Sequence, residues 1–393
     1  MLSQDDLSVG ESAIYDRQIR LWGSSSQLRI KSASVLFLGV TGTTVEILKN
    51  SVLAGAGVMV ADDRAVDESS RNFLIDLEVS DTAYMSVSEA TVIAARRLNE
   101  HPKISSLKES DEVLYSAISS VSALVVSLSH IRGNATQAVA LSSECRKKGV
   151  GFFLVVDFHN LSWSFSDFGR THVVESHTAP LKRDERTGKR ASDTAIEEFE
   201  FVDLEEFISA EIETNFANSK SSFPLRQVFF VKFFLEWKLK DAFAADKESA
   251  PSPKRARRSH VPREKSVFRE YVESRLAGLC EMEGKLGGFF KINSDELLVD
   301  LDQMGETIRC NRMALPHIAA VHGALISQEI IKLITKRDAP LVNQIVMNPL
   351  DCGAIVIKTP SRLSSTKIGG GVSPEEDEVQ IVQAAGSVDV IEF

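Results

Sequence analysis

The segment that most restricts the fold is an apolar run at residues 33–38 that leads into a glycine turn and then into a helical pattern. The turn contains Gly39 and Gly42, and apolar residues then recur at helical spacing over residues 43–53. A second apolar run follows at residues 58–61. This order of strand, turn, helix and strand predicts a βαβ unit, the building block of a parallel sheet.

The same rhythm continues to about residue 157. Helices are predicted over 88–98 and 137–147, and apolar strands over 123–128 and 151–156. Continuous rather than alternating apolar strands indicate a parallel sheet covered on both faces. Residues 161–168 alternate aromatic or aliphatic side chains with serines, which predicts a half-buried antiparallel strand.

The second half of the chain is less regular. Polar loops are predicted at 176–198 and 247–265, and a buried helix or subunit contact at 228–237. A helix over 318–334 with strands at 344–347 and 354–357 then completes the sheet. The expected fold is α/β with a mixed, mainly parallel sheet. The expected divisions are a first Rossmann-like part at 1–175, a small α+β insertion at 176–300, a return to the first domain at 301–360, and a disordered acidic tail at 361–393.

Composition excludes several classes of protein. The 393 residues carry a net charge of −10, which argues against binding to nucleic acid. No run reaches the roughly 20 uninterrupted apolar residues of a membrane helix, so no membrane association is expected. The four cysteines form no Cys-x-x-Cys pair, and no metal site is expected.

The glycine turn has part of a nucleotide-binding fingerprint. Such a fingerprint needs three glycines, but Thr44 stands at the third position, where its β-branched side chain is expected to loosen helix packing. Asp62 lies where an acidic group accepts hydrogen bonds from a ribose. Gly39, Gly42 and Asp62 are therefore the residues of a degenerate cofactor site. The alternatives are an ordinary βα turn and an aspartate that caps the next turn.

Three segments together resemble a known family. They are Tyr-Asp-Arg-Gln-Ile-Arg-Leu-Trp-Gly at residues 15–23, the Gly39-x-x-Gly42 turn, and the helical segment at residues 317–332. The chain resembles, over roughly residues 13–358, the non-catalytic subunit of the heterodimeric activating enzymes for ubiquitin-like modifiers.

The resemblance implies a ThiF/MoeB-type adenylation fold that has lost its own active site. A working site has an Asp-x-Asp after the second strand, whereas this chain reads Asp62-Asp63-Arg64. ATP and Mg²⁺ are thus expected on the catalytic partner, with none bound firmly by this chain. Arg17 is implied to reach the partner's ATP in trans. Without the resemblance, Arg17 reads as one half of an ion pair with Asp16 or another carboxylate.

The expected partners are the catalytic subunit of the heterodimer and the modifier SUMO. A regulatory subunit for neddylation is an alternative, although that subunit has a much longer central insertion. Two further alternatives are a pure scaffold in which Arg17 is idle and, from a different class, an NAD-dependent Rossmann oxidoreductase. The chain shows no evident catalytic His or Tyr arrangement for the oxidoreductase.

Two short motifs lie outside the predicted domains. A basic run beside prolines predicts nuclear import and hence a nuclear location, and it consists of Lys254, Arg255, Arg257 and Arg258. A hydrophobic pattern with adjacent acids near the end of the chain is a candidate for adding a strand to SUMO, and its apolar residues are Val388, Val390 and Ile391.

Overall fold

A nine-stranded sheet forms the centre of the protein. The computed structural model describes residues 7–67, 70, 72–75, 85–158, 161–176, 195–210, 223–245, 266–275, 295, 298–302, 315–347, 354–357 and 381–382. The strand order is β11-β10-β9-β6-β5-β4-β1-β2-β3. The strands are β1 (Ser34–Leu38), β2 (Gly57–Ala61), β3 (Ile104–Leu107), β4 (Ala123–Ser127), β5 (Gly151–Phe158), β6 (Leu161–Asp167), β9 (Gln344–Met347), β10 (Ala354–Ile357) and β11 (Ile381–Val382).

Strands β3, β2, β1, β4 and β5 are parallel, and β6, β9, β10 and β11 continue the sheet in antiparallel pairs. The predicted α/β class with a mixed, mainly parallel sheet is therefore confirmed. The order of the parallel strands places a topological switch point, where a nucleotide-type crevice usually lies, at the carboxyl ends of β1 and β4. The chain runs from β1 to β2 and β3 on one side and then crosses to β4 on the other side.

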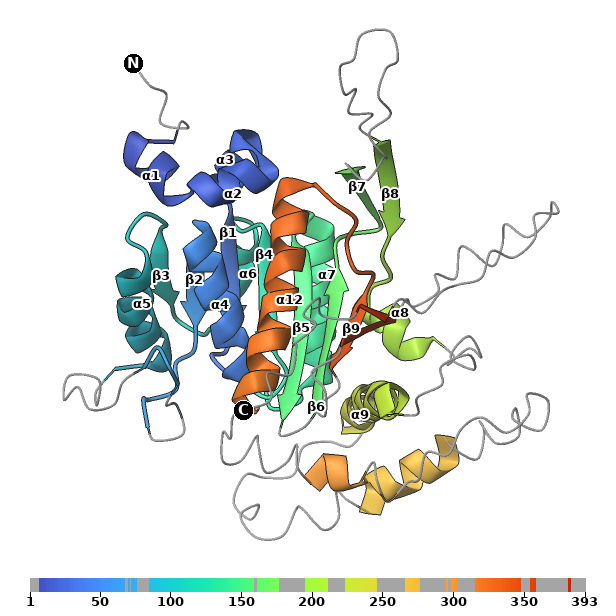
Figure 1. The fold of residues 1–393 in the computed structure, drawn as a ribbon. Helices are drawn as coiled ribbons and strands as arrows, with labels where there is room; N and C mark the ends of the chain where they lie inside the picture. The colour runs from blue at the N-terminus through green and yellow to red at the C-terminus, as the bar shows by residue number, and fades with distance from the viewer. Residues whose placement is uncertain are drawn as a thin grey trace, which may run out of the picture.

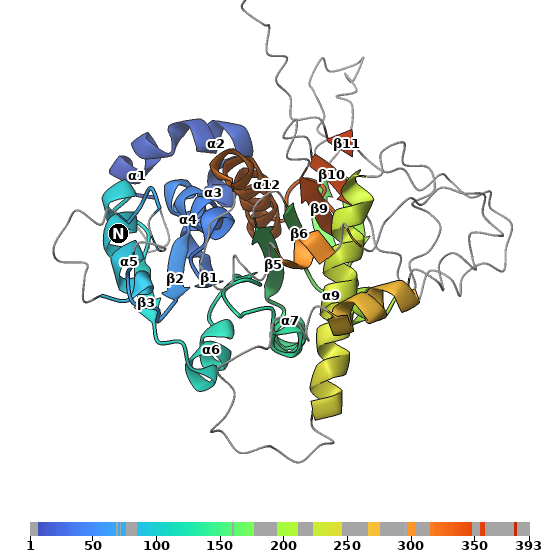
Figure 2. The same ribbon diagram turned by 90° about the horizontal axis from the view of Figure 1, so that it is seen from below.

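Helices cover both faces of the sheet (Figures 1 and 2). One face packs against α4, α5 and α12, and the other against α6, α7, α8 and α9. Continuous burial on both sides explains why the central strands are apolar throughout. The helices are α4 (Gly42–Ala54), α5 (Val87–Leu98), α6 (Asp111–Ile118), α7 (Ala135–Lys148), α8 (Leu204–Ser209), α9 (Phe223–Ala245) and α12 (Pro316–Thr335).

Most predicted elements occur within a residue or two of their expected bounds, and β9 and β10 match fully. The predicted buried segment at 228–237 lies inside α9, and its side chains enter the core on the α7 face. Helix α12 is long and apolar enough to span a membrane by length and composition, but it packs along α4 as a core helix.

The prediction of a half-buried strand at 161–168 is wrong in one respect. The strand is antiparallel, but its serines are buried as well as its aromatic residues. Ser162 and Ser164 contact the two ring nitrogens of His322 on α12, and Ser166 Oγ donates to the Asn343 carbonyl at 3.3 Å. Small hydroxyl side chains can therefore alternate with apolar ones on a fully covered strand when each finds a partner.

The predicted polar loop at 176–198 is wrong at its carboxyl end. Strand β7 (Thr171–Ser176) pairs with β8 (Ala195–Glu200) in a separate two-stranded ribbon. Residues 177–194 and the second predicted loop at 247–265 lie outside the described residues. The predicted tail also lies outside them, apart from β11, which pairs with β10.

Three short helices precede the sheet: α1 (Val9–Ile14), α2 (Asp16–Trp22) and α3 (Ser24–Ser32). They lie at the top of Figure 1, beside the carboxyl ends of α4 and α12. Gln27 Nε2 donates to the carbonyl of Ala54 at 2.9 Å, and Arg337 donates to the carbonyl of Trp22. These contacts hold the N-terminal helices firmly on the body of the protein.

Candidate functional site: a filled nucleotide-type turn and an exposed arginine

The glycine turn lies in the crevice at the carboxyl end of β1. Gly39 has a φ of +92°, a conformation that favours glycine. A Cβ atom on Gly39 would lie 2.3 Å from the Cβ of His130, which comes from the loop after β4. The His130 side chain is 2% exposed. The space that a fingerprint glycine leaves open for phosphate therefore holds an imidazole.

The amino terminus of α4 binds an internal carboxylate. Asp157, on β5, is fully buried, and its Oδ2 accepts a hydrogen bond from the Thr43 backbone N–H at 2.8 Å. Burial raises the pKa of Asp157 to about 6, although the Thr43 hydrogen bond opposes this shift. The first N–H groups of a helix attract anions, and phosphate is the usual ligand in nucleotide-binding folds. Here the carboxylate of the chain itself occupies that position.

Thr44 closes the turn rather than loosening it, so the expectation of loosened packing is wrong. Its hydroxyl donates to the Gly39 carbonyl at 2.9 Å and accepts from the Thr41 backbone N–H at 2.7 Å. Thr44 is buried together with Gly42 at the start of α4. Thr44 thus stands in place of the third glycine, and its compact side chain forms hydrogen bonds inside the turn.

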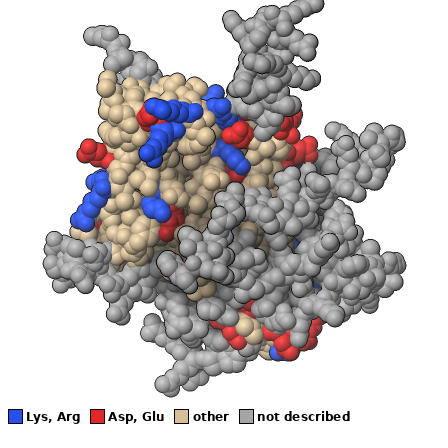
Figure 3. Space-filling view, viewed as in Figure 1, with Lys and Arg blue, Asp and Glu red and all other residues tan. Residues whose placement is uncertain are grey.

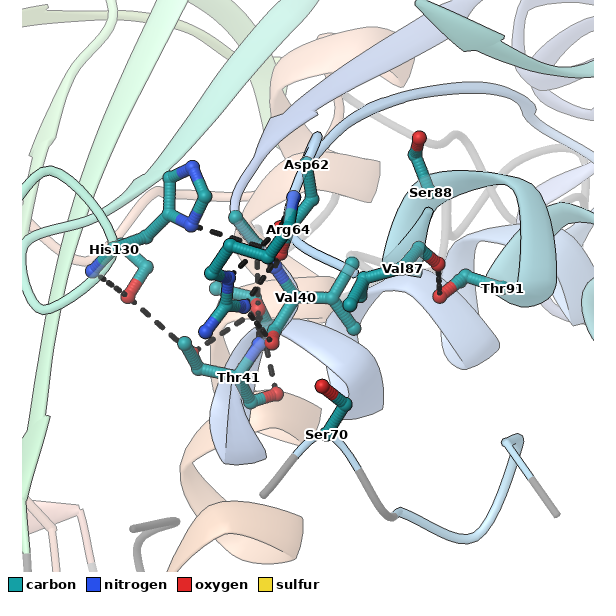
Figure 4. A network of polar contacts seen from close by, with 12 residues as sticks. Val40, Thr41, Asp62, Arg64, Ser70, Val87, Ser88, Thr91 and His130 are labelled. Atoms are coloured by element: carbon teal, nitrogen blue, oxygen red, sulfur yellow. Dashed lines mark hydrogen bonds and ion pairs between the residues drawn. The ribbon is translucent and has the colours of Figure 1, made fainter. Parts of the chain in front are cut away.

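The carboxylate of Asp62 also accepts hydrogen bonds from neighbouring residues (Figure 4). Arg64 donates to it from Nε at 2.8 Å and from Nη2 at 2.6 Å, and the Val40 backbone N–H donates at 2.9 Å. Both oxygens of the carboxylate are engaged, and Asp62 is fully buried. The ribose-binding reading of Asp62 would require Arg64 to leave. The geometry favours the alternative in which Asp62 caps the turn that follows it, because its Oδ1 also accepts from the Arg64 backbone N–H at 3.3 Å.

Asp62, Glu109 and His130 form a cluster whose ligand-type atoms lie within 4.8 Å of one another. The ring nitrogens of His130 lie 3.0 Å from Glu109 Oε1 and 3.6 Å from Asp62 Oδ2. Residues of this type can hold a metal ion. However, the guanidinium of Arg64 already supplies a positive charge to Asp62, which opposes the entry of a cation.

Arg17 lies on α2 and is exposed. The alternative in which it pairs with Asp16 is not met, because Asp16 pairs with Arg20 at 3.0 Å. Among the described residues, Arg17 makes no hydrogen bond or ion pair. Figure 3 shows basic side chains gathered over the N-terminal helices. Arg17 therefore presents a guanidinium to whatever approaches this end of the molecule.

Arg17 and the turn at Gly39 lie at opposite ends of α4. A Cβ atom on Gly55, which follows the carboxyl end of α4, would lie 2.9 Å from the Tyr15 ring, two residues before Arg17. The turn precedes the amino end of the same helix, whose 13 residues span about 20 Å at 1.5 Å per residue. The guanidinium cannot cover that distance. The structure brings Gly39, Gly42 and Asp62 together but leaves Arg17 apart from them.

The remaining predicted residues cannot be placed. Both the basic run at 254–258 and the hydrophobic pattern at 388–391 lie outside the described residues. The sequence reasoning missed His130 and Asp157, which fill the turn. A polar residue at the end of a predicted buried strand was the signal for Asp157, because the carboxyl ends of parallel strands share one edge of the sheet.

The fold and the site define an α/β protein whose nucleotide-type crevice is filled by its own side chains. No protein-family model matches the chain. Curated relatives with the name SUMO-activating enzyme subunit 1 do match. The protein from Xenopus tropicalis is 26% identical over 348 residues, covering 85% of this chain and 91% of the relative. The protein from Homo sapiens is 26% identical over 350 residues, with the same coverage of 85% and 91%. Subunit 1B-1 from Arabidopsis thaliana is 26% identical over 353 residues, covering 86% and 93%.

The chain is thus similar, over most of its length, to SUMO-activating enzyme subunit 1 of animals and plants, which confirms the family resemblance predicted from its motifs. Among solved structures, the crystal structure of SeMet PaaA superposes with a TM-score of 0.47 at 11% identity, covering 90% of this chain and 84% of that one.

Proposed function

We propose that this chain is the non-catalytic subunit of a heterodimeric SUMO-activating enzyme. The catalytic partner holds ATP and Mg²⁺ and adenylates the carboxyl terminus of SUMO, and this chain supplies Arg17 in trans. The similarity to SUMO-activating enzyme subunit 1 supports the pathway. The observation that carries the division of labour is the placement of Arg17, unpaired, at the far end of α4 from a turn that is already filled.

The filled turn is the reason to expect that the chain alone does not bind ATP. Triphosphate at this turn would have to displace the Asp157 carboxylate from the Thr43 N–H and the His130 ring from Gly39. It would also meet the buried negative charge of Asp157 once that carboxyl group is ionised. Both effects oppose an anionic ligand. The residues present here therefore do not fit the nucleotide, and ATP chemistry belongs to the partner.

The role of Arg17 follows from the charge that adenylation creates. The modifier carboxylate attacks the α-phosphate, the bond to the β-phosphate breaks, and pyrophosphate leaves with additional negative charge. A guanidinium beside the leaving group stabilises it through paired hydrogen bonds. This stabilisation acts most strongly in the transition state, where the charge develops, so it raises the rate of the chemical step.

The same proposal has three further parts. SUMO is the modifier, the protein is located in the nucleus, and the tail pattern at 388–391 is a contact for SUMO. The competing neddylation role shares the chemistry and differs in the modifier. One experiment separates the two: the purified chain is combined with the catalytic subunit of the SUMO-activating enzyme, and ATP–pyrophosphate exchange is measured with SUMO or with the neddylation modifier.

Exchange is expected only when both subunits and SUMO are present. Exchange by this chain alone would contradict the proposed division of labour. Exchange that requires the neddylation modifier and the corresponding catalytic subunit would move the chain to that pathway. A catalytic subunit that exchanges pyrophosphate equally well without this chain would leave no role for Arg17.

A further inference from the structure

The N-terminal helices expose large apolar side chains next to Arg17. Ile14 is 59% exposed and Leu21 is 73% exposed, and Val9 projects further along α1. Leu53, at the end of α4, is also exposed, and its carbonyl accepts a hydrogen bond from Gln18 Nε2 at 3.4 Å. Exposed apolar residues that gather on one part of a surface are typical of an interaction site, whereas single ones are not.

Leu21 shares a face of α2 with Arg17, because it stands four residues after it in the same helix. Ile14 is the last residue of α1, three residues before Arg17, and it is exposed. Tyr15 separates the two helices, with φ −94° and ψ 13°. The opposite side faces the protein, where the Tyr15 ring is buried and its hydroxyl accepts from Asn99 at 2.8 Å. We call Ile14, Arg17 and Leu21 the docking face.

The docking face is held in place before any partner arrives. The Trp22 indole N–H donates to Gln27 Oε1 at 3.0 Å, and Gln27 in turn donates to Ala54 at the end of α4. Arg29 donates to the carbonyl of Thr335 at the end of α12. A surface that needs no reordering loses little conformational entropy on binding, so its apolar area is converted efficiently into affinity.

The charge of the docking face selects its occupant. A cation between two apolar side chains fits a partner surface that offers an anion within an apolar rim. A second copy of this chain does not offer one at its nucleotide-type turn, because there the buried carboxylates of Asp62 and Asp157 already hold Arg64 and the Thr43 N–H. A subunit that holds a triphosphate in the corresponding crevice does offer such an anion.

We propose that Ile14 and Leu21 seat this chain on the nucleotide-holding face of the catalytic subunit and thereby hold Arg17 at the triphosphate. This inference rests on the proposed function and adds the residues that provide affinity. Ile14 and Leu21 contribute to association because each leaves water on docking, whereas Arg17 contributes to the rate of the reaction. They are positioning residues, since neither touches the reacting atoms.

The test measures affinity and rate separately. The dissociation constant between the full chain and the catalytic subunit of the SUMO-activating enzyme is determined by titration calorimetry without ATP. For the variant with both Ile14→Ser and Leu21→Ser, the dissociation constant is expected to rise at least about tenfold. At saturating concentrations of that variant, pyrophosphate exchange is expected to return to within about twofold of the unsubstituted pair, because the guanidinium is retained.

Ile93→Ser is the matched control. Ile93 lies on α5, is 41% exposed and is not part of the docking face, so its substitution is expected to leave the dissociation constant unchanged. Arg17→Ala gives the reverse pattern, with nearly unchanged affinity in the absence of ATP and a low rate. Melting temperatures of all variants check that each is folded.

The outcomes separate the two proposals. If the unsubstituted chain binds the catalytic subunit and the double serine variant binds equally well, the docking face is refuted while the proposed function stands. If the unsubstituted chain does not bind the catalytic subunit, the proposed function fails and this inference fails with it. If the chain instead forms a homodimer that the double variant abolishes, the occupant of the docking face is a second copy and the proposed occupant is refuted.

Discussion

At the scale of single residues, internal side chains replace the groups of a nucleotide. Asp157 accepts the helix N–H that usually meets a phosphate, and Arg64 engages the carboxylate that usually meets a ribose. His130 covers the glycine between them. Each of these residues is of an ordinary type. Their effect comes from the edge of the sheet where they meet.

His322 is a residue whose environment makes stability depend on pH. It is buried between Ser162 and Ser164, and burial lowers its pKa from 6.5 to about 3. Below pH 6.5 the unfolded chain takes up a proton there and the folded chain does not, so acid favours unfolding. This contribution is absent above pH 6.5 and grows as the pH falls, by at most about 1.4 kcal/mol per pH unit.

His322→Gln is therefore expected to flatten the dependence of the free energy of unfolding on pH between 6.5 and 4.5. The variant is less stable overall at neutral pH because glutamine does not refill the space. Urea unfolding at several pH values measures the slope, and His101→Gln, which removes an exposed imidazole, is the control. A slope identical to that of the unsubstituted protein would show that His322 does not titrate as described.

At the scale of the elements, α4 and α12 pack closely at one glycine. A Cβ atom on Gly323 would lie 2.5 Å from the Glu46 Cβ and 3.1 Å from the Thr43 carbonyl oxygen. Both atoms belong to or adjoin the backbone of α4, so neither can move without displacing the helix. The filled turn begins at this same end of α4, which links the packing of α12 to the geometry of the site.

Gly323→Ala is expected to lower the free energy of unfolding by about 1–3 kcal/mol. At an open helix position, replacing glycine by alanine would instead raise the free energy of unfolding by up to about 1 kcal/mol, so the sign of the change reports the clash. Gly10→Ala provides that comparison, because its nearest neighbour would be 4.0 Å away on α1. Equal stabilisation by both substitutions, in chemical denaturation, would contradict the close packing.

A buried ion pair joins α7 to β6. Arg146 donates to both oxygens of Asp167, at 2.8 and 2.9 Å, and also to the carbonyl of Phe201. Arg146→Met leaves the carboxylate of Asp167 buried without its partner and is expected to cost about 3–5 kcal/mol of folding free energy. Lys147→Met, at an exposed neighbouring position, is expected to change stability by less than about 0.5 kcal/mol. A mild effect of Arg146→Met would mean that water reaches Asp167 readily.

At the scale of the whole molecule, the central sheet followed from the sequence because its strands are short, apolar and separated by helices of clear periodicity. The sequence did not predict β3 or α6. In β3 only Ile104 is buried, so this strand lacks the continuous apolar pattern of the central strands. The burial of the β6 serines was also missed, because their partner His322 lies some 160 residues away. The state of the turn was only partly predictable for the same reason. Thr44 showed that the fingerprint is incomplete, but the groups that fill it come from β5 and from the loop after β4.

The arrangement of the whole molecule is consistent with the proposal that Arg17 acts on a second subunit. Arg17 lies near the carboxyl end of α4 and the filled turn precedes its amino end, so the two features do not meet within one chain. Under the proposed function, this chain donates an arginine and a docking face to its partner.

The most direct measurement is the ATP–pyrophosphate exchange rate of the reconstituted pair with Arg17→Ala at saturating subunit concentration. The loss of one charged hydrogen-bond donor to the leaving group is expected to lower that rate by about 10²-fold or more. Arg20→Ala, one turn further along α2 and already paired with Asp16, is expected to stay within about twofold of the unsubstituted pair. A rate for Arg17→Ala equal to that of Arg20→Ala would contradict the account and leave this chain as a scaffold.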